Sequence, residues 1–266
     1  MLQIQRLWLL VAIVALGTMA GTPVVVAQTV PATPATPNAG APKDEMGDMI
    51  AGLLGEIDDR WSEMFQASGQ SYKGPRIVLF RNATNGGRCG IVQSAMGPFY
   101  CPPDKLIYLD TSYFREIETR FHGCSGDSCK FTAAYVIARQ AGHHIQNLIG
   151  ILPRVKRLQE QAGSKAVANA LQVKIELQAD CLSGVWFNLE EMKRPGFLQV
   201  GGLEAALTTA EALGDDTLQR QATGKVVPDS FTHGSAAQRK QWFTTGYREG
   251  AMEACNTFGA AAPDPR

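Results

Sequence analysis

The side chains best suited to chemistry in this sequence are those of His143, Glu176 and Asp180. Imidazole nitrogens and carboxylate oxygens are among the ligands that zinc takes in proteins. Glu176 and Asp180 are four residues apart in a stretch whose apolar residues recur at helical spacing, so both carboxylates are expected on one face of a helix. The pattern indicates a site that could hold a metal ion. The alternative interpretation is that both acids are solvated residues of a helix surface.

The window that ends at His143 departs from a known metal-binding pattern. A helix that binds catalytic zinc often carries His-Glu-x-x-His, in which the two His hold the metal and the Glu acts as general base. Here the window reads Arg139-Gln140-Ala141-Gly142-His143. The guanidinium of Arg139 has no lone pair for a metal, and Gln140, at the position of the general base, cannot take a proton from water at neutral pH. His143 and Glu176 would be two remnant ligands where catalytic zinc usually has three, so we expect weak zinc binding or none.

Longer stretches of the chain resemble the neutral zinc metallopeptidase family, in order and within about residues 45–258. They are Gly97–Pro102, Tyr135–Ile151, Glu176–Trp186 and Ser230–Ser235. The resemblance implies an α+β fold that is mainly helical, with a small sheet beside the helix that carries the site. It also implies zinc as the cofactor of the family.

The resemblance assigns roles to individual residues. In metallopeptidases whose third ligand is a Glu, the helix with that Glu lies against the helix with the His. Glu176 takes the ligand position, and Asp180 takes the position of an acid that hydrogen-bonds a metal-binding His. His233 takes a position that lines the site, where it could donate a hydrogen bond to an oxyanion; alternatively, it caps or packs a turn. His144, beside the ligand position, is expected to pack rather than to bind metal.

Arg139 is predicted to replace the metal as the positive centre of the site. Without zinc, Glu176 and Asp180 would face each other's charge, which raises the pKa of a carboxyl group and destabilises the fold. A guanidinium offers five donors and a permanent charge. We therefore predict that Arg139 reaches across to the second helix and pairs with Glu176, Asp180 or both. The alternative is that Arg139 extends into solvent.

These residues support three hypotheses about function. The first is a catalytically inactive relative of the peptidases that binds a peptide or protein in the former active-site cleft. The second is an active zinc-dependent peptidase with an altered ligand set that recruits His122, His144 or His233. The third is a structural protein of the cell envelope. Basic and acidic residues are balanced at 25 each, which argues against a nucleic-acid partner.

The elements that must position the site can be traced from periodicity and turn residues. We expect helices at about residues 45–65, 111–121, 133–149, 154–161, 165–189, 202–213 and 236–245, and short strands at 76–80, 89–96 and 106–109. Asp110 could cap the helix that follows it. Each of the two site helices has an apolar stripe on the side opposite to its candidate site residues.

Both ends of the chain are expected to lie outside the folded domain. In residues 1–27, Arg6 precedes an apolar run and Val-Val-Ala ends the segment, which predicts a signal peptide cleaved after Ala27 and export to the periplasm or the medium. The alternative is an uncleaved anchor, which would make the membrane a partner. Residues 28–43, rich in Pro, Ala and Thr, should form a linker, residues 44–258 the metallopeptidase-like domain, and residues 259–266 a flexible tail.

The six cysteines of the chain are Cys89, Cys101, Cys124, Cys129, Cys181 and Cys255. An even count behind a signal peptide indicates an oxidising compartment and disulfides, although the count does not fix the connectivity. We predict the pairs Cys89–Cys101, Cys124–Cys129 and Cys181–Cys255, the last tying the second site helix to the C-terminus. An alternative for the loop that precedes the first site helix is a metal site formed by His122, Cys124 and Cys129.

Overall fold

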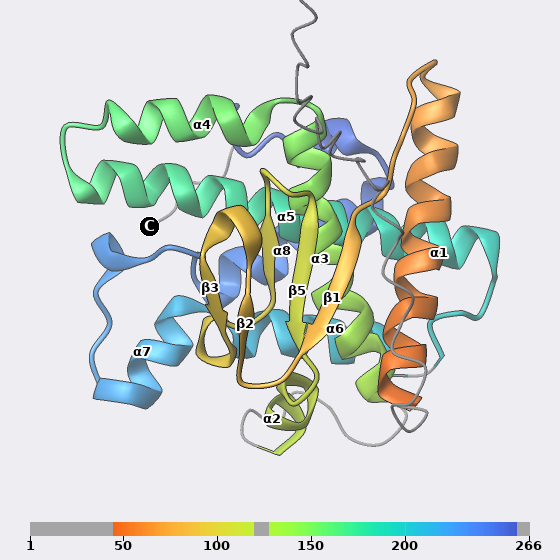
Figure 1. Cartoon of the computed structure of the whole chain (residues 1–266), viewed down its shortest axis with the longest axis horizontal. Helices are drawn as coiled ribbons and strands as arrows, with labels where there is room; N and C mark the ends of the chain where they lie inside the picture. Colours follow the sequence, from red (N-terminus) through yellow and green to blue (C-terminus); the bar gives the residue numbers. More distant parts are fainter. Residues whose placement is uncertain (1–44, 120–127, 200, 260–266) are drawn as a thin grey trace, which may run out of the picture. The chain divides into compact units, whose positions relative to one another are not determined.

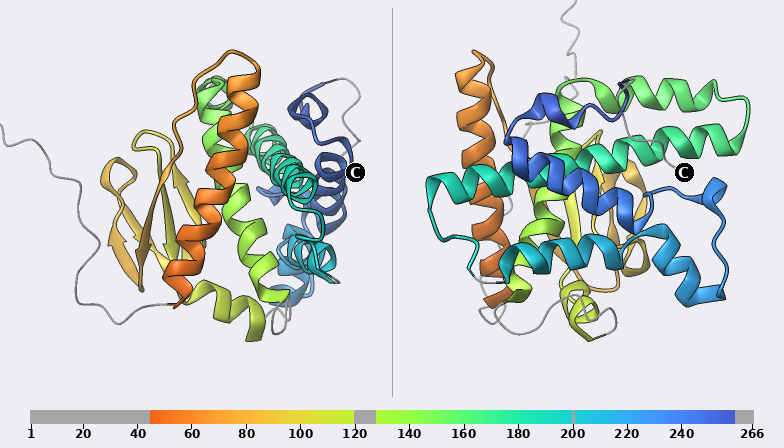
Figure 2. Two further views of the ribbon diagram at one scale, coloured as in Figure 1. Left: turned by 90° about the vertical axis from the view of Figure 1, so that its right-hand side faces the viewer. Right: turned by 180° about the vertical axis from the view of Figure 1, so that it is seen from behind.

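A computed structural model describes residues 45–119, 128–199 and 201–259 of the chain. These residues form an α+β fold that is mainly helical, as predicted, with a small sheet and a separate strand hairpin (Figure 1). In the left view of Figure 2 the elements lie in layers, with the strands on one side, then α1 and α3, then α5, and α8 on the far side. The predicted signal peptide and linker, and all but the first residue of the predicted tail, lie outside the described residues.

The predicted helices are present in the predicted order, with α7 in addition. They are α1 (Glu45–Ala67), α2 (Tyr113–Thr119), α3 (Cys129–Leu148), α4 (Ile151–Glu160), α5 (Lys165–Lys193), α6 (Gly202–Ala212), α7 (Asp215–Thr223) and α8 (Ala236–Glu249). Short 3-10 turns join some of them and the strands: η1 (Gly87–Cys89), η2 (Ser94–Met96), η4 (Pro228–Ser230) and η5 (Met252–Cys255). The two site helices of the sequence analysis are α3 and α5.

The sheet lies beside α3. Its strand order is β1 (Arg76–Phe80), β5 (Leu106–Asp110) and β4 (Phe99–Cys101), with β1 parallel and β4 antiparallel to β5. β2 (Ala83–Asn85) and β3 (Ile91–Gln93) form the separate antiparallel hairpin. Tyr100, Ile107 and Leu109 bury their side chains in the same core as the helices. β4 is therefore an edge strand of a sheet that packs against the helical core.

The central parts of both site helices are buried on all sides. Every residue of α3 from 131 to 146 is buried, and so is every residue of α5 from 175 to 187. The predicted apolar stripes are real, but the polar residues opposite them do not face solvent. They face each other across the α3–α5 interface, where hydrogen bonds and ion pairs replace water.

Glycines determine how closely these helices approach. A Cβ on Gly142 of α3 would lie 3.1 Å from the carbonyl oxygen of Ala179, so the backbones of α3 and α5 nearly touch there. A Cβ on Gly184 of α5 would overlap the backbone of Phe243, and one on Gly246 of α8 would overlap that of Cys181. α8 thus packs directly on the backbone of α5 and supports the helix that carries Glu176.

Some local predictions were wrong. Residues 89–96 were expected to form one strand, but only Ile91–Gln93 is extended, because the turns η1 and η2 flank it. β2, β4 and α7 were not expected. Asp110 accepts hydrogen bonds from Ser112, which directly precedes α2, and from the backbone N–H of Asn82. It fixes the approach to α2 rather than the first turn of the helix.

The predicted disulfides Cys89–Cys101 and Cys181–Cys255 are present. The first links η1 to β4, and the second links α5 to η5. The third predicted pair includes Cys124, which lies outside the described residues, as does His122 of the alternative metal site. Within the described ranges, no helix has both the length and the apolar character that a membrane span requires.

Candidate functional site

Arg139 lies between the two acids of α5, as predicted. Its Nε donates a hydrogen bond to Oδ1 of Asp180 at 3.0 Å, and its Nη2 pairs with Oε2 of Glu176. All three residues are buried, and Arg139 is only 8% exposed. The alternative, an arginine extended into solvent, is wrong. A guanidinium thus forms the positive centre between the two carboxylates.

Arg239, from α8, completes a buried cluster of charges that we did not predict. Its Nε donates to Oδ2 of Asp180 at 2.9 Å, its Nη2 to the hydroxyl of Tyr135 at 2.7 Å, and its Nη1 to the carbonyl of Leu213 at 2.6 Å. Tyr135 donates in turn to Oδ1 of Asp180 at 2.6 Å. We call Arg139, Glu176, Asp180 and Arg239 the ion cluster. Two arginines balance two acids in it, so it carries no net charge from these four groups.

The sequence does contain a signal for Arg239. It precedes Trp242 and Phe243 by three and four residues, which places it on the apolar face of α8 together with these buried side chains. An arginine on such a face must find an acid, because a buried unpaired charge is very costly. Tyr135 is likewise one helical turn before Arg139, on the same side of α3. Their positions in the sequence could have identified both residues as candidates for the site. The sequence does not show that Asp180 is the acid that they share.

The charges of the ion cluster stabilise one another. Burial favours the neutral form of Glu176, but the interactions with His143 and Arg139 outweigh it and hold the pKa of this carboxyl well below its ordinary value. Burial likewise opposes the charged form of Arg239, yet Asp180 and Tyr135 hold its pKa above the ordinary value. Both groups are therefore charged at neutral pH, and each depends on partners from other helices.

His143 keeps the geometry of a metal ligand. Nε2 of Gln146 donates to the carbonyl of Ile175 and to Oε1 of Gln178, so Oε1 of Gln146 faces Nδ1 of His143 at 2.9 Å and accepts a hydrogen bond from its N–H. This leaves Nε2 of His143 pointing at Oε2 of Glu176, 3.2 Å away. Two ligands that are each about 2.0–2.1 Å from a tetrahedral zinc lie about 3.3 Å apart. His143 and Glu176 thus keep the separation of two ligands of one metal ion.

The residues around this pair do not fit a zinc ion. The position of a third ligand is taken by Arg139, whose guanidinium cannot ligate metal and whose charge repels it. The oxygen of Glu176 that faces His143 is the one that Arg139 pairs with. Within the part of the chain that the structure describes, no group of three or more His, Cys, Asp or Glu is placed to hold a metal. The arrangement therefore has two side chains at the separation of metal ligands and an internal cation beside them.

His144 does not face the site. Its Nε2 donates to the carbonyl of Lys73 at 2.8 Å, and its Nδ1 accepts from the hydroxyl of Tyr100 at 2.9 Å. Burial lowers the pKa of this His, so it is neutral, with both nitrogens engaged. As predicted, it is a packing residue, and it is not free to serve in an altered ligand set.

His233 reaches the site from the turn before α8. The backbone N–H groups of Thr232, His233 and Gly234 donate to Oδ2 of Asp215 at 2.7, 2.6 and 3.1 Å, which fixes the turn. The ring itself remains 49% exposed, with Nδ1 at 3.4 Å from Oδ1 of Asp215. Its backbone shapes the turn while its ring lines the cavities described next.

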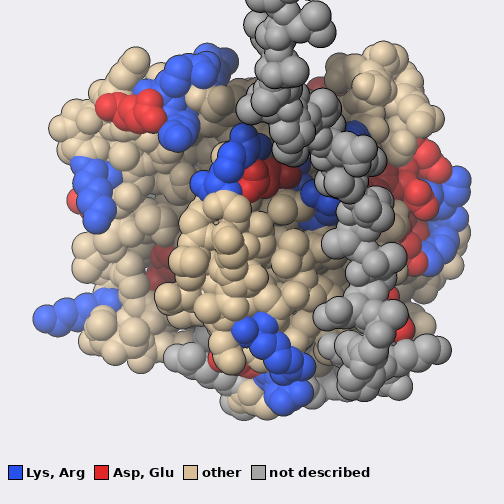
Figure 3. Space-filling model, in the orientation of Figure 1, with Lys and Arg blue, Asp and Glu red and all other residues tan. Residues whose placement is uncertain are grey.

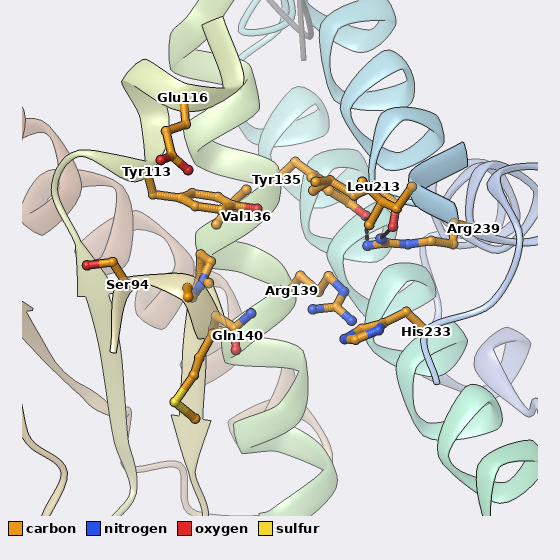
Figure 4. A pocket seen from close by; sticks show the side chains of 15 residues that line it. Ser94, Tyr113, Glu116, Tyr135, Val136, Arg139, Gln140, Leu213, His233 and Arg239 are labelled. Atoms are coloured by element: carbon orange, nitrogen blue, oxygen red, sulfur yellow. Dashed lines mark hydrogen bonds between the residues drawn. The ribbon is translucent and has the colours of Figure 1, made fainter. Parts of the chain in front are cut away.

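A cleft of two adjoining cavities lies in front of the ion cluster. Their volumes are about 550 and 750 Å³, and Arg139, Gln140 and His233 line both. The smaller cavity is bordered by Ser94 on the strand side and by Arg239 on the helix side (Figure 4). The larger lies between β4, α4 and α5, on the face where the surface is hollowed beside the strand hairpin (Figure 3). The cleft is therefore open to a ligand that approaches from this face.

The chain belongs to the family described as "Putative neutral zinc metallopeptidase", whose profile matches residues 6–258. It is 43% identical over 243 residues to "Uncharacterized protein YpfJ" of Escherichia coli (strain K12), an alignment that covers 91% of this chain and 80% of that protein. It is also 43% identical over 213 residues to "Uncharacterized protein Mb2605" of Mycobacterium bovis, covering 77% of this chain and 68% of the other. No solved structure matches the chain.

Proposed function

We propose that this protein is an exported, catalytically inactive member of its family that binds a peptide or protein segment in the former active-site cleft. The observation that carries the proposal is the guanidinium of Arg139 between Glu176 and Asp180. It fills the place of a metal ligand with a group that cannot bind metal. Gln140 stands where the general base of the zinc-binding pattern would stand, and an amide cannot take a proton from water at neutral pH.

The cleft supports the binding part of the proposal. Phe99 and Tyr100 of the edge strand β4 line the larger cavity. An edge strand presents backbone N–H and C=O groups to which an extended peptide can add as a further strand. The cleft also has the size of a small-ligand or peptide pocket. A protein that has lost its chemistry can keep a groove of this kind as a recognition site.

Metal analysis and a matched revertant test the loss of activity. Protein purified without chelator should hold no stoichiometric zinc after dialysis and should not cleave a casein substrate above background. The double variant Arg139→His with Gln140→Glu should gain zinc, because it supplies the third ligand beside His143 and Glu176. Arg139→His with Gln140 unchanged is the matched control, which should bind zinc without cleaving. Chelator-sensitive cleavage by the wild type would contradict the proposal.

Export has a separate test. The mature protein isolated from the producing cell should begin near Gln28 and show no titratable thiol when denatured without reductant, because cytosolic reductants would keep thiols free. The disulfides of the described residues, Cys89–Cys101 and Cys181–Cys255, support an oxidising compartment. An intact mass that retains Met1, together with free thiols, would contradict export.

A further inference from the structure

Two side chains of α3, Arg139 and Gln140, have hydrogen-bonding groups at the cleft that no described residue engages. Arg139 uses Nε and Nη2 in the ion cluster, whereas its Nη1 makes no hydrogen bond to any residue that the structure describes. The amide of Gln140 makes none within the same described ranges, although this residue is only 3% exposed. Neither group is among the described side-chain atoms that are both fully buried and unpaired, so water in the open cleft can bind both. A ligand that displaces this water must offer hydrogen-bond acceptors to both donors.

Both side chains are aimed at the same place. Arg139 and Gln140 line both cavities of the cleft, and so does His233. Figure 4 shows Arg139 and Gln140 extending from α3 into the smaller cavity, with the ring of His233 facing them from the other side. The three groups surround a common space that no described side chain fills.

The charges around the larger cavity favour an anionic ligand. Arg88, Arg139 and Lys156 are its cationic lining residues, and Glu176 is the acid among the described ones. Arg139 and His143 already engage Glu176. Lys156 makes no ion pair within the described part of the chain, and it is exposed at the border of the cavity. Arg88 pairs with Asp104, and Arg139 pairs with Glu176 and Asp180. Among the described lining residues, Lys156 therefore supplies the unpaired positive charge at the wall that a ligand would meet.

We propose that the cleft binds a carboxylate, held by Nη1 of Arg139 and Nε2 of Gln140. The inference rests on the proposed function and narrows it from any peptide to a peptide that carries a carboxylate at this point. A guanidinium gives carboxylates short, charge-assisted hydrogen bonds, about twice as strong as those to a neutral carbonyl. The carboxylate can be the C-terminus of the peptide or the side chain of Asp or Glu, because both present the same two oxygens.

Randomised octapeptide mixtures distinguish these sources. Four mixtures would be offered to the full-length protein in equilibrium dialysis: with or without Asp and Glu, and each with a free or an amidated C-terminus. Mass spectrometry measures what is retained. We expect the mixtures that carry a carboxylate to be retained at least roughly tenfold more than the neutral amidated one, about the effect of one charge-assisted hydrogen bond. Two of the mixtures carry only one kind of carboxylate: the one without Asp and Glu but with a free C-terminus, and the one with Asp and Glu but an amidated C-terminus. Comparing their retention shows whether the terminus or the side chain is preferred.

Variants tie the binding to the two donors. Arg139→Lys keeps a cation between Glu176 and Asp180 but has no second nitrogen to turn toward the cleft, so retention of the acidic mixtures should fall roughly tenfold. Gln140→Leu should weaken it in the same direction. Lys156→Ala should weaken it slightly, whereas Lys165→Ala, an exposed lysine that does not line the cleft, is the matched control and should change nothing.

A competition experiment on the wild type needs no folded variant. Sodium acetate should displace the acidic peptides, whereas acetamide, and sodium chloride at the same ionic strength, should displace far less. Equal retention of the acidic and the neutral amidated mixtures would overturn the carboxylate proposal and leave peptide binding intact. Retention of none of the four mixtures would overturn both the carboxylate proposal and the proposed function.

Discussion

At the scale of single residues, one substitution changes what a site can hold. A neutral His at position 139 could ligate zinc, but an Arg brings its own charge and five donors. Asp180 accepts a hydrogen bond from Nε of Arg139. In the family pattern, the acid at this position accepts a hydrogen bond from a metal-binding His. Glu176 and Asp180 both pair with the guanidinium of Arg139, and the interior stays electrically balanced. The site thus holds two acids and a cation without needing a metal ion.

Arg139→Ala should therefore be strongly destabilising. It leaves Glu176 with His143 alone and removes one of two cations from Asp180, so we expect the free energy of unfolding to fall by about 3–5 kcal/mol. Urea denaturation at pH 7 measures it. Lys240→Ala, which breaks an exposed ion pair with Glu211, is the control and should cost less than about 1 kcal/mol. A loss that small at Arg139 would show that the ion cluster does not support the fold.

The buried carboxyl group of Asp58 should make the free energy of unfolding depend on pH. It accepts a hydrogen bond from Tyr72 at 2.8 Å, but burial raises its pKa to about 6 from an ordinary 3.8. Because the folded pKa is raised, the stability that this group contributes is full below about pH 4 and is lost as the pH rises through about 6. Asp58→Asn removes this loss and should stabilise the protein at pH 7.5 by about 1–2 kcal/mol, after allowing for partial exposure.

Denaturation curves at pH 4.5 and 7.5 check this prediction. The gap in unfolding free energy between Asp58→Asn and the wild type should widen toward the higher pH. Asp48→Asn, at an exposed position of the same helix, is the matched control and should leave the pH dependence as it is. A gap that narrows toward pH 7.5 would show that the fold does not raise the pKa of Asp58.

At the scale of elements, the site depends on how closely three helices pack. α5 lies between α3 and α8, and glycines at both interfaces allow contact between backbones. Glu176 and Asp180 face α3, while Arg239 reaches Asp180 from α8. A change in the spacing of α5 and α8 would therefore pull the ion cluster apart even though no charged residue had changed.

Gly246→Ala tests this dependence. The added Cβ would overlap the backbone of Cys181, which no side-chain movement can relieve, so we expect a loss of at least about 2 kcal/mol in unfolding free energy or failure to fold. Gly52→Ala on α1 is the control: it meets nothing within 4 Å, and it should stabilise the helix by about 0.5–1 kcal/mol. Thermal melts of both variants measure the contrast. Equal melting temperatures would mean that the helices can separate without cost.

Periodicity predicted the elements better than the contacts between them. Helical spacing located α3 and α5, and chemical type suggested that Arg139 would seek Glu176 and Asp180. Arg239 was missed because it lies 59 positions from Asp180, and nothing local indicates which acid a distant arginine meets. β4 was missed because it has only three residues, Phe99–Cys101, between two turns. Local propensity thus specifies elements, whereas tertiary packing decides which polar residues are buried together.

At the scale of the whole molecule, the two described disulfides close loops of very different size. Cys89–Cys101 spans 12 residues within the strand region, and Cys181–Cys255 spans 74, from α5 to the end of the described domain. The longer link also reaches the site. The carbonyl of Cys255 accepts from Gln178, which in turn accepts from Gln146, the partner of His143. The covalent closure of the fold and the orientation of His143 are therefore connected.

Removing each disulfide should reveal this difference. In the chain-entropy account, a loop of 12 residues contributes about 3 kcal/mol and one of 74 about 4.5 kcal/mol. Cys181→Ala with Cys255→Ala should therefore lower the free energy of unfolding more than Cys89→Ala with Cys101→Ala, measured by urea denaturation without reductant. The first variant should also loosen the Gln178–Gln146–His143 chain, which faster amide hydrogen exchange at the end of α3 would report, while the second should leave exchange there unchanged. If the shorter loop proves the more stabilising and exchange in α3 does not respond, the C-terminal link holds the chain end alone and not the site.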